Sequence, residues 1–371
     1  MDLYHLERPI FIVDRRKVWR NLEYMTKKAV VSGVRLRPHV KTHQSAAVAS
    51  WLKDFGIQSL TVSSVDMASY FVKAGWEDIM IAVPVNIHQI PSIDALANAC
   101  SLHVILDSKI ASEKLLDGIT HPLYVWIEMD TGYHRTGVPV ENTTLMVEIA
   151  NSIRQSPFLK LQGILVHDGH TYTVDGPEEV RRIFTKSFRS LTGALEALKT
   201  TGFPNLELSI GDTPTCSVLD TFPAPITEIR PGTFIFYDLT QAGVGVCQNH
   251  DIAAAVACPV ISRHPERGEV ILYGGSVHIS KEFLRNKDGS ANYGRVSRLN
   301  EQQTGWTDPI PEVSLISLSQ EHGIIRGPAH FIESINIGDP LVILPVHVCL
   351  TANLHREFYV LGEGIIPKFQ L

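Results

Sequence analysis

SLTVSSVDMASYFVKAGWEDIMIAVP, residues 59–84, contains one complete strand–helix–strand pattern. Its ends, SLTVSS (59–64) and DIMIAVP (78–84), are short runs rich in β-branched residues, and the segment between them has the apolar spacing of an amphipathic helix. Two strands joined through a helix pair in parallel, because a parallel pair needs a long crossover connection. The stretch therefore predicts a βαβ unit of a parallel sheet.

The same alternation extends in both directions along the chain. Candidate strands lie at 34–40, 59–64, 78–84, 102–107, 123–130, 161–168, 206–211 and 226–232, with amphipathic segments between most of them. Eight such strands in about 240 residues are typical of a TIM barrel. An open, doubly wound sheet is the alternative, but no GxGxxG motif follows an early strand. We therefore predict an α/β fold with a (β/α)8 TIM barrel over residues 10–248.

The pattern changes after about residue 248, where helical periodicity is weak. Short, β-rich runs bounded by turn residues occupy 251–264, 268–280, 312–326 and 339–351. They predict a second, mostly antiparallel β domain over residues 249–371, and residues 1–9 can belong to either domain. The segment 285–311 is polar and rich in Gly, Asn and Asp, which predicts a long hairpin or surface loop.

Composition narrows the class of protein. The 371 residues are 44% hydrophobic and 19% charged, as in ordinary soluble globular enzymes. A net charge of −6 without a long basic block gives no support to a nucleic acid or an anionic membrane as a partner. The N-terminal residues lack the order of a signal peptide, and five scattered cysteines form no CxxC pair. We expect a cytoplasmic enzyme with a small-molecule substrate.

Polar motifs follow five of the predicted strands. They are RPHVKTH (37–43), MDTGYHRTG (129–137), HDGHTY (167–172), GDTPT (211–215) and RPGT (230–233). Active-site residues of parallel barrels gather at the C-terminal ends of the strands. Each motif alone is also typical of a turn with a helix cap. Their coincidence at five strand ends predicts a functional site there.

Lys41 is the candidate nucleophile of this site. Most lysines are solvated and have no chemical role. The alternative is a lysine that forms a Schiff base with a carbonyl, its pKa lowered by cationic neighbours such as Arg37, His39 and His43. GDTPT and RPGT expose backbone N–H groups and hydroxyls, as anion binding requires. A lysine, two anion-binding turns and the aromatic Tyr172 on one rim meet the needs of pyridoxal 5′-phosphate (PLP).

A second candidate site lies in the apolar run LVILPVHVCL (341–350). In an extended strand, His347 and Cys349 point to the same face, so both can reach one metal ion. An imidazole and a thiolate suit zinc, and two protein ligands leave positions for water or substrate. Free cysteine is a common core residue, so the run taken alone is more typical of simple packing.

The ordered set of motifs resembles a known family. PIFIVDRRKVWRNLEYM (9–25), RPHVKTH, DTGYHRTG, HDGHTY, GDTPT and EIRPGTFIFYD (228–238) together are similar to the D-threonine aldolase and D-serine dehydratase group of alanine-racemase-like, fold type III PLP enzymes. The resemblance covers nearly the whole chain. It implies PLP on Lys41, a divalent metal on His347 and Cys349, and contacts to PLP from Arg135, Tyr172, Thr213, Gly232 and Thr233. It also implies a homodimer in which the second domain of one subunit helps to build the site of the other.

The metal-binding pair distinguishes branches of this group. His-x-Cys resembles the zinc D-serine dehydratases, whereas D-threonine aldolases carry His-x-Asp, and a thiolate prefers zinc. The resemblance thus implies a PLP- and Zn²⁺-dependent lyase, with another divalent metal as an alternative. The implied reaction is elimination of water from D-serine or a related D-β-hydroxy amino acid, which gives a 2-oxo acid and ammonia.

Several other activities remain open at this point. Retro-aldol cleavage to glycine and an aldehyde uses the same groups, and an amino-acid racemase or a non-catalytic PLP carrier shares the barrel. A barrel metallohydrolase without PLP needs more clustered His and Asp ligands than the strand ends supply. YGGSVHIS (273–280), with Tyr273 and His278, departs from the pattern of the group and leaves the substrate within the D-β-hydroxy class open.

Overall fold

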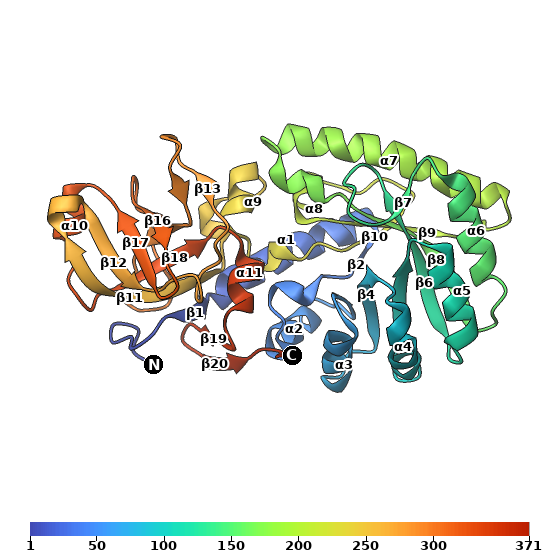
Figure 1. The fold of residues 1–371 in the computed structure, drawn as a ribbon, viewed down its shortest axis with the longest axis horizontal. Helices are drawn as coiled ribbons and strands as arrows, with labels where there is room; N and C mark the ends of the chain where they lie inside the picture. Colours follow the sequence, from blue (N-terminus) through green and yellow to red (C-terminus); the bar gives the residue numbers. More distant parts are fainter. Residues whose placement is uncertain (371) are drawn as a thin grey trace. The chain divides into compact units, whose positions relative to one another are not determined.

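The computed structural model describes residues 1–370 and divides into two compact units (Figure 1). One unit comprises residues 23–232, and the other comprises residues 1–22 and 233–370. No helix within residues 1–370 combines the length and the apolar character needed to cross a membrane.

The unit of residues 23–232 is built on a parallel sheet. Its main strands are β2 (Arg35–Leu36), β3 (Ser59–Val62), β4 (Asp78–Pro84), β5 (Ser101–Leu106), β6 (Leu123–Asp130), β8 (Leu159–His167), β9 (Glu207–Gly211) and β10 (Ile226–Ile229). They pair in parallel in the order β2-β10-β9-β8-β6-β5-β4-β3. A parallel bridge from His39 to Thr61 links the two edges. The sheet is therefore a nearly closed barrel, which confirms the predicted fold class and all eight predicted strands.

Helices follow the strands and lie around the outside of the barrel (Figure 1). They are α2 (Ala46–Lys53), α3 (Val65–Lys73), α4 (Ile90–Ala97), α5 (Lys109–Gly118), α6 (Thr143–Ile153), α7 (Pro177–Thr200) and the short α8 (Thr213–Val218). Serines begin three of them, because the hydroxyls of Ser45, Ser64 and Ser108 accept backbone N–H groups that the helix leaves unpaired. These caps fix where each strand end turns into a helix.

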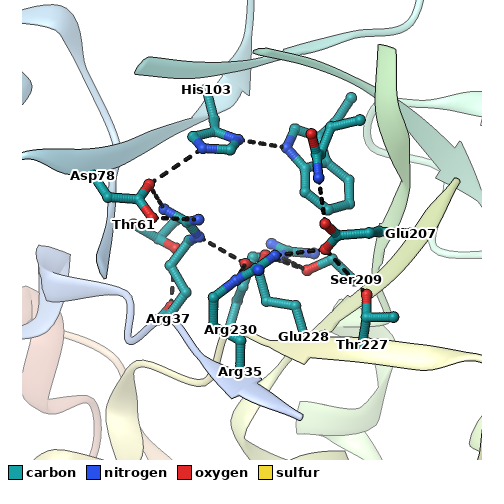
Figure 2. A network of polar contacts seen from close by, with 12 residues as sticks. Arg35, Arg37, Thr61, Asp78, His103, Glu207, Ser209, Thr227, Glu228 and Arg230 are labelled. Carbon is teal, nitrogen blue, oxygen red and sulfur yellow. Dashed lines mark hydrogen bonds and ion pairs between the residues drawn. The ribbon is translucent and has the colours of Figure 1, made fainter. Parts of the chain in front are cut away.

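A buried ionic network fills part of the barrel interior (Figure 2). The guanidinium of Arg37 is 1% exposed and lies between two carboxylates, with Nε 2.8 Å from Glu228 Oε2 and an Nη atom 2.5 Å from Asp78 Oδ1. Glu228 also accepts from Arg35 at 2.6 Å and from the Ser209 hydroxyl at 2.7 Å. Buried charges are tolerated only when they are paired in this way. The network is next to a layer of buried side chains from neighbouring strands, Met80, Ile105, Trp126 and Leu165.

The other unit contains a nine-stranded sheet. Its strands are β1 (Ile10–Val13), β11 (Ala254–His264), β12 (Glu269–Tyr273), β15 (Gly294–Ser297), β16 (Ser314–Leu318), β17 (His322–Arg326), β18 (Pro340–Pro345), β19 (Glu357–Val360) and β20 (Gly364–Pro367). Strand β12 pairs with both β17 and β11, so six antiparallel strands form a closed ring, β11-β12-β17-β16-β15-β18. The sheet continues from β11 through β1, β19 and β20. The pairing of β1 with β19 is parallel. The predicted, mostly antiparallel domain is confirmed.

The two units begin and end at other residues than the expected division at 10–248 and 249–371. Ile10–Val13 pair with residues 254–257 of β11, so this strand belongs to the antiparallel sheet. The chain then enters α1 (Arg15–Ser32), and the boundary falls inside this helix. Pairing partners more than 240 residues away leave no trace in the local sequence pattern, because hydrophobic periodicity reports only local structure.

The polar segment 285–311 is only partly a surface hairpin. Strands β13 (Leu284–Arg285) and β14 (Ala291–Asn292) form the hairpin, but β15 pairs with β16 and β18 inside the large sheet. The prediction of one long loop was therefore wrong for residues 294–297. Val296 and Ser297 are fully buried there, although their polar neighbours in the sequence favoured a loop.

Candidate active site

Lys41 lies in one turn of 3₁₀ helix, Val40–Thr42, directly after the strand that begins the barrel. The backbone N–H of Lys41 donates to Nδ1 of His39 at 3.3 Å. The imidazole of His39 is an acceptor here, and burial together with the positive charges of Lys41 and Arg230 holds its pKa well below the usual value. A neutral histidine therefore binds the backbone N–H of Lys41.

The surroundings of Lys41 are electropositive. His167 ends β8, and burial followed by the charges of Lys41, Arg135 and Arg230 lowers its pKa well below the usual value. The same three cations act on His39. Three positive side chains at the C-terminal ends of the strands create a potential that attracts an anion. The predicted position of Arg135 near this rim is consistent with its effect on both imidazoles.

Arg135 is placed by its own loop, DTGYHRTG. Its guanidinium lies over the ring of Tyr133, 5.1 Å from the ring centroid. The Tyr133 ring in turn packs on Gly169, where an added Cβ would lie 2.4 Å from ring carbons. The loop after β6 and the turn after β8 are therefore in direct contact, and a side chain at Gly169 would separate them.

Two hydrogen bonds join residues from three different strand ends, Tyr172, Thr213 and Gly232. The N–H of Thr213 donates to the Tyr172 hydroxyl at 3.0 Å, and the N–H of Gly232 donates to the Thr213 hydroxyl at 3.3 Å. A Cβ on Gly232 would lie 2.9 Å from the carbonyl oxygen of His39, so only glycine fits against the turn that holds Lys41. The structure therefore brings these three predicted residues and the Lys41 turn together.

These residues fit PLP. The turn that carries Lys41 lies beside backbone N–H groups and hydroxyls in a positively charged region, as an aldehyde with a phosphate group requires. Lys41 would hold the cofactor, and Tyr172, Thr213 and Gly232 would contact it. Thr233 follows Gly232 and belongs to the other unit, where its hydroxyl lies 3.7 Å from Cys349 Sγ.

His347 and Cys349 are not in a strand. Strand β18 ends at Pro345, and Cys349 lies in the first turn of α11 (Val348–Asn353), directly after His347. The prediction that both share one face of an extended strand was wrong. The buried carboxylate of Asp238 accepts the N–H of Val348 at 3.0 Å, and the N–H of Thr351 bonds to the His347 carbonyl at 3.1 Å, which starts the helix.

The two side chains are nevertheless adjacent, because the imidazole of His347 is hydrogen-bonded to the Cys349 thiol. Nδ1 of His347 contacts Glu282 at 2.7 Å. Burial lowers the pKa of His347, but the hydrogen bond and charge of Cys349, with Asp238 and Glu282, outweigh it and raise the pKa to about 10. The acidic surroundings therefore stabilise positive charge at this position.

This donor set suits a metal ion with open coordination positions. Residues 1–370 contain no cluster of three or more His, Cys, Asp or Glu side chains suited to a metal, so His347 and Cys349 stand as a pair. An imidazole and a thiolate favour zinc. The Glu282 contact occupies Nδ1, so Nε2 is the nitrogen that would hold a metal ion.

Sequence reasoning missed several residues of the two sites. His167, Asp168, Asp212, Arg230 and Asp238 stand inside motifs that the sequence singled out, but no pattern marked them individually. No sequence pattern marks Glu282 as a site residue, because it is 65 residues from His347 and follows no recognisable motif.

Comparison with known proteins identifies the two halves of the chain. The family model of the alanine racemase N-terminal domain matches residues 13–240, and a model described as a putative serine dehydratase domain matches residues 253–361. D-threo-3-hydroxyaspartate dehydratase of Delftia sp. is 32% identical, over 99% of this chain and 98% of the relative. D-serine dehydratase of Dictyostelium discoideum is 28% identical, over 100% and 97%.

Solved structures agree with this assignment. The Delftia dehydratase superposes with a TM-score of 0.90 at 30% identity, covering 100% of this chain and 99% of that one. Alanine racemase of Bacillus anthracis, at 15% identity and a TM-score of 0.66, shows the same fold over 98% of both chains. The chain therefore belongs to the alanine-racemase-like, fold type III family of PLP enzymes, in the group that contains D-serine dehydratase and D-threonine aldolase.

Proposed function

We propose that this protein is a PLP- and Zn²⁺-dependent lyase that eliminates water from a D-β-hydroxy amino acid, giving a 2-oxo acid and ammonia. The observation that carries the proposal is the hydrogen-bonded pair of His347 and Cys349 in acidic surroundings. A racemase or a PLP carrier has no need of such a pair. Relatives named D-threo-3-hydroxyaspartate dehydratase and D-serine dehydratase, which match along nearly the whole chain, support the same reaction.

Lys41 is the group that moves the proton at Cα. PLP, when bound, supplies a conjugated ring that delocalises the negative charge left at Cα after proton loss. The amine of Lys41 takes the proton, and its position is fixed by the His39 contact and by the turn packed on Gly232. Because His39 and His167 stay neutral, the positive charge at these strand ends comes from Lys41, Arg135 and Arg230.

His347 and Cys349 serve the second half of the reaction, departure of the β-hydroxyl. Hydroxide is a poor leaving group, and a divalent metal supplies the Lewis acid that stabilises it. Nε2 of His347 and the sulfur of Cys349 would hold the metal, while Glu282 orients the imidazole. Loss of the Cα proton and the hydroxyl removes one molecule of water, and hydrolysis of the remaining enamine gives the 2-oxo acid and ammonia.

A metal-free cysteine-to-alanine mutant of a D-threo-3-hydroxyaspartate dehydratase has been solved, with a TM-score of 0.90 to this chain at 29% identity. The metal-free form supports a role of a cysteine in metal binding for that relative. We propose the same role for Cys349, with zinc as the metal, because a thiolate and an imidazole favour it over magnesium or manganese.

Retro-aldol cleavage is the second candidate, since a relative named D-threonine aldolase, from Arthrobacter, matches over 98% of the chain at 24% identity. The decisive experiment incubates the purified protein with D-serine, D-threonine and D-threo-3-hydroxyaspartate, with and without a chelator, and identifies the products. A 2-oxo acid with ammonia, lost on chelation, supports elimination. Glycine with an aldehyde would assign the aldolase reaction instead.

We also propose that the active enzyme is a homodimer, as the resemblance to the group implies. Light scattering of the purified protein provides the test. A mass of two chains of 41.2 kDa is expected, and a monomer with full activity would contradict the proposal.

A further inference from the structure

Two buried carboxyl groups stand directly behind the PLP-contacting residues without a part in the reaction above. Asp168 follows β8 and Asp212 follows β9, and each is 3% exposed. The hydroxyl of Thr171 contacts both segments, at 2.8 Å from the Asp168 carbonyl and 3.0 Å from Asp212 Oδ1. The Asp168 carboxylate accepts from the Thr131 hydroxyl. The pair thus joins the turns that precede Tyr172 and Thr213.

Asp212 combines an unusual backbone conformation with two side-chain hydrogen bonds. Its φ is +153°, in the region that favours glycine, yet the position holds an aspartate. Oδ1 accepts the N–H of Thr215 at 2.6 Å in addition to the Thr171 hydroxyl. An unfavourable conformation persists only where the surroundings fix it, and such positions cluster at functional sites. These two contacts fix the residue just before Thr213.

Burial makes ionisation of both carboxyl groups unfavourable. Burial, followed by the charge of Asp168, raises the pKa of Asp212 to about 8, although the hydrogen bonds from Thr215 and Thr171 oppose the shift. Burial also raises the pKa of Asp168. The titratable and charged groups around the pair are Asp130 and His170 on the Asp168 side, Cys216 on the Asp212 side, and Lys28 and Arg230 next to Cys216.

We propose that Asp212 is a positioning residue that, in its protonated form, holds Tyr172 and Thr213 in place for the phosphate of PLP, and that its ionisation weakens phosphate binding. This inference rests on the proposed function, because it takes Tyr172 and Thr213 as contacts to PLP. A neutral carboxyl keeps the Thr171 and Thr215 contacts and adds no negative charge beside a dianionic phosphate. A carboxylate at the same place repels the phosphate through a medium of low dielectric.

The test compares PLP with pyridoxal, which has the same aldehyde and ring but no phosphate. Both dissociation constants are measured by absorbance on the full-length protein, stripped of cofactor, between pH 6.5 and about 9.5. Titration of Lys41 affects both ligands, and the phosphate of PLP itself has a pKa of about 6. The ratio of the two constants is therefore read above pH 7 and compared with the same ratio in Asp212→Asn. We expect the preference for PLP to fall by up to roughly tenfold between pH 7 and pH 9, as one group with a pKa near 8 ionises.

Variants assign the effect to Asp212. Asp212→Asn keeps an acceptor for Thr215 and Thr171 but cannot ionise, so its preference for PLP should not change with pH. Glycine adopts the positive φ of position 212 without strain, but Asp212→Gly loses the hydrogen bonds to Thr171 and Thr215. This variant should therefore bind PLP more weakly at every pH. Asp220→Asn, on an exposed aspartate just beyond α8, is the matched control and should follow the wild type.

The outcomes are separable. Two results would overturn the role of Asp212. The first is a wild-type ratio of the PLP and pyridoxal dissociation constants that does not change with pH. The second is an Asp212→Asn protein whose ratio changes with pH as in the wild type. If neither PLP nor pyridoxal binds the wild-type protein at any pH, the proposed function is wrong, and so is the role of Asp212.

Discussion

The hydroxyl of Tyr172 accepts the backbone N–H of Thr213 at 3.0 Å, which links the turn after β8 to the turn after β9. The hydroxyl of Thr213 in turn accepts the N–H of Gly232, which follows β10. Three strand ends are therefore joined by two hydrogen bonds. Because parallel barrels gather active-site residues at these ends, the chain of contacts defines the place where PLP is proposed to bind.

Tyr172→Phe tests this link. The substitution leaves the buried N–H of Thr213 without its acceptor, which costs about 1–3 kcal/mol. If the loss falls on the cofactor-bound state, the dissociation constant of PLP rises by roughly 5- to 150-fold. Absorbance titration with PLP measures it, and Tyr4→Phe, on an exposed tyrosine far along the sequence, is the control. Unchanged affinity in Tyr172→Phe would remove Tyr172 from the site.

Gly232→Ala tests the close approach of two segments. The added Cβ would stand 2.9 Å from the His39 carbonyl and 3.0 Å from His39 Cβ, so the turn that holds Lys41 must move. We expect strongly reduced PLP binding. Gly193→Ala is the matched control, because Gly193 lies inside α7 with nothing within 4 Å of an added Cβ. That change should stabilise the helix by about 0.5–1 kcal/mol and leave PLP binding intact. Equal PLP affinity in both variants would contradict the proposed site.

Glu282→Gln tests the metal pair without touching a ligand. Removal of the charge from the partner of His347 Nδ1 should weaken metal binding by roughly 10- to 100-fold. Titration with cobalt(II) gives the dissociation constant and shows a sulfur-to-metal absorption band when Cys349 is bound. Cys349→Ala should lose that band and keep PLP. Glu301→Gln, on an exposed glutamate, should match the wild type. A Glu282→Gln protein with wild-type metal affinity would contradict the orienting role.

Glu228→Gln tests the ionic network inside the barrel. The variant leaves Arg37, which is 1% exposed, without one of its two carboxylate partners, and we expect a loss of about 3–5 kcal/mol in the free energy of unfolding at pH 7. Urea unfolding measures it. Glu196→Gln breaks an exposed pair with Lys199 in α7 and should cost less than about 1 kcal/mol.

The same network gives a pH dependence with a defined sign. Burial raises the pKa of Glu228, but Arg37 and Arg35 outweigh it and lower the pKa to about 2. The stabilisation is therefore complete above the ordinary glutamate value near pH 4.5 and is lost as the pH falls toward 2. The difference between wild type and Glu228→Gln should shrink over that range. A difference that stays constant would show that folding does not lower the pKa of Glu228.

Local pattern was sufficient for the barrel and its rim. The eight strands and the five polar motifs at their ends follow from β-branched runs and helical spacing, which act over a few residues. The network behind the rim was not predictable. Arg37 was interpreted as a cationic neighbour of Lys41, but its guanidinium binds Asp78 and Glu228 inside the barrel, and Glu228 lies 191 residues further along the chain.

The second unit shows a different limit. The run LVILPVHVCL is apolar throughout, and such a run does not reveal where a strand ends and a helix begins. The answer depends on Asp238, whose carboxylate binds the N–H of Val348 from 110 residues away. The chemistry of His347 and Cys349 was therefore predicted for a conformation that the chain does not adopt, although the two side chains still meet.

The proposed reaction depends on covalent binding of PLP to Lys41. Reduction of the purified holoprotein with borohydride, followed by digestion and mass spectrometry, measures it directly. We expect a pyridoxyl-phosphate modification on the peptide that contains Lys41, and none in Lys41→Ala. A modification on another lysine, or retention of the cofactor by Lys41→Ala after reduction, would contradict it.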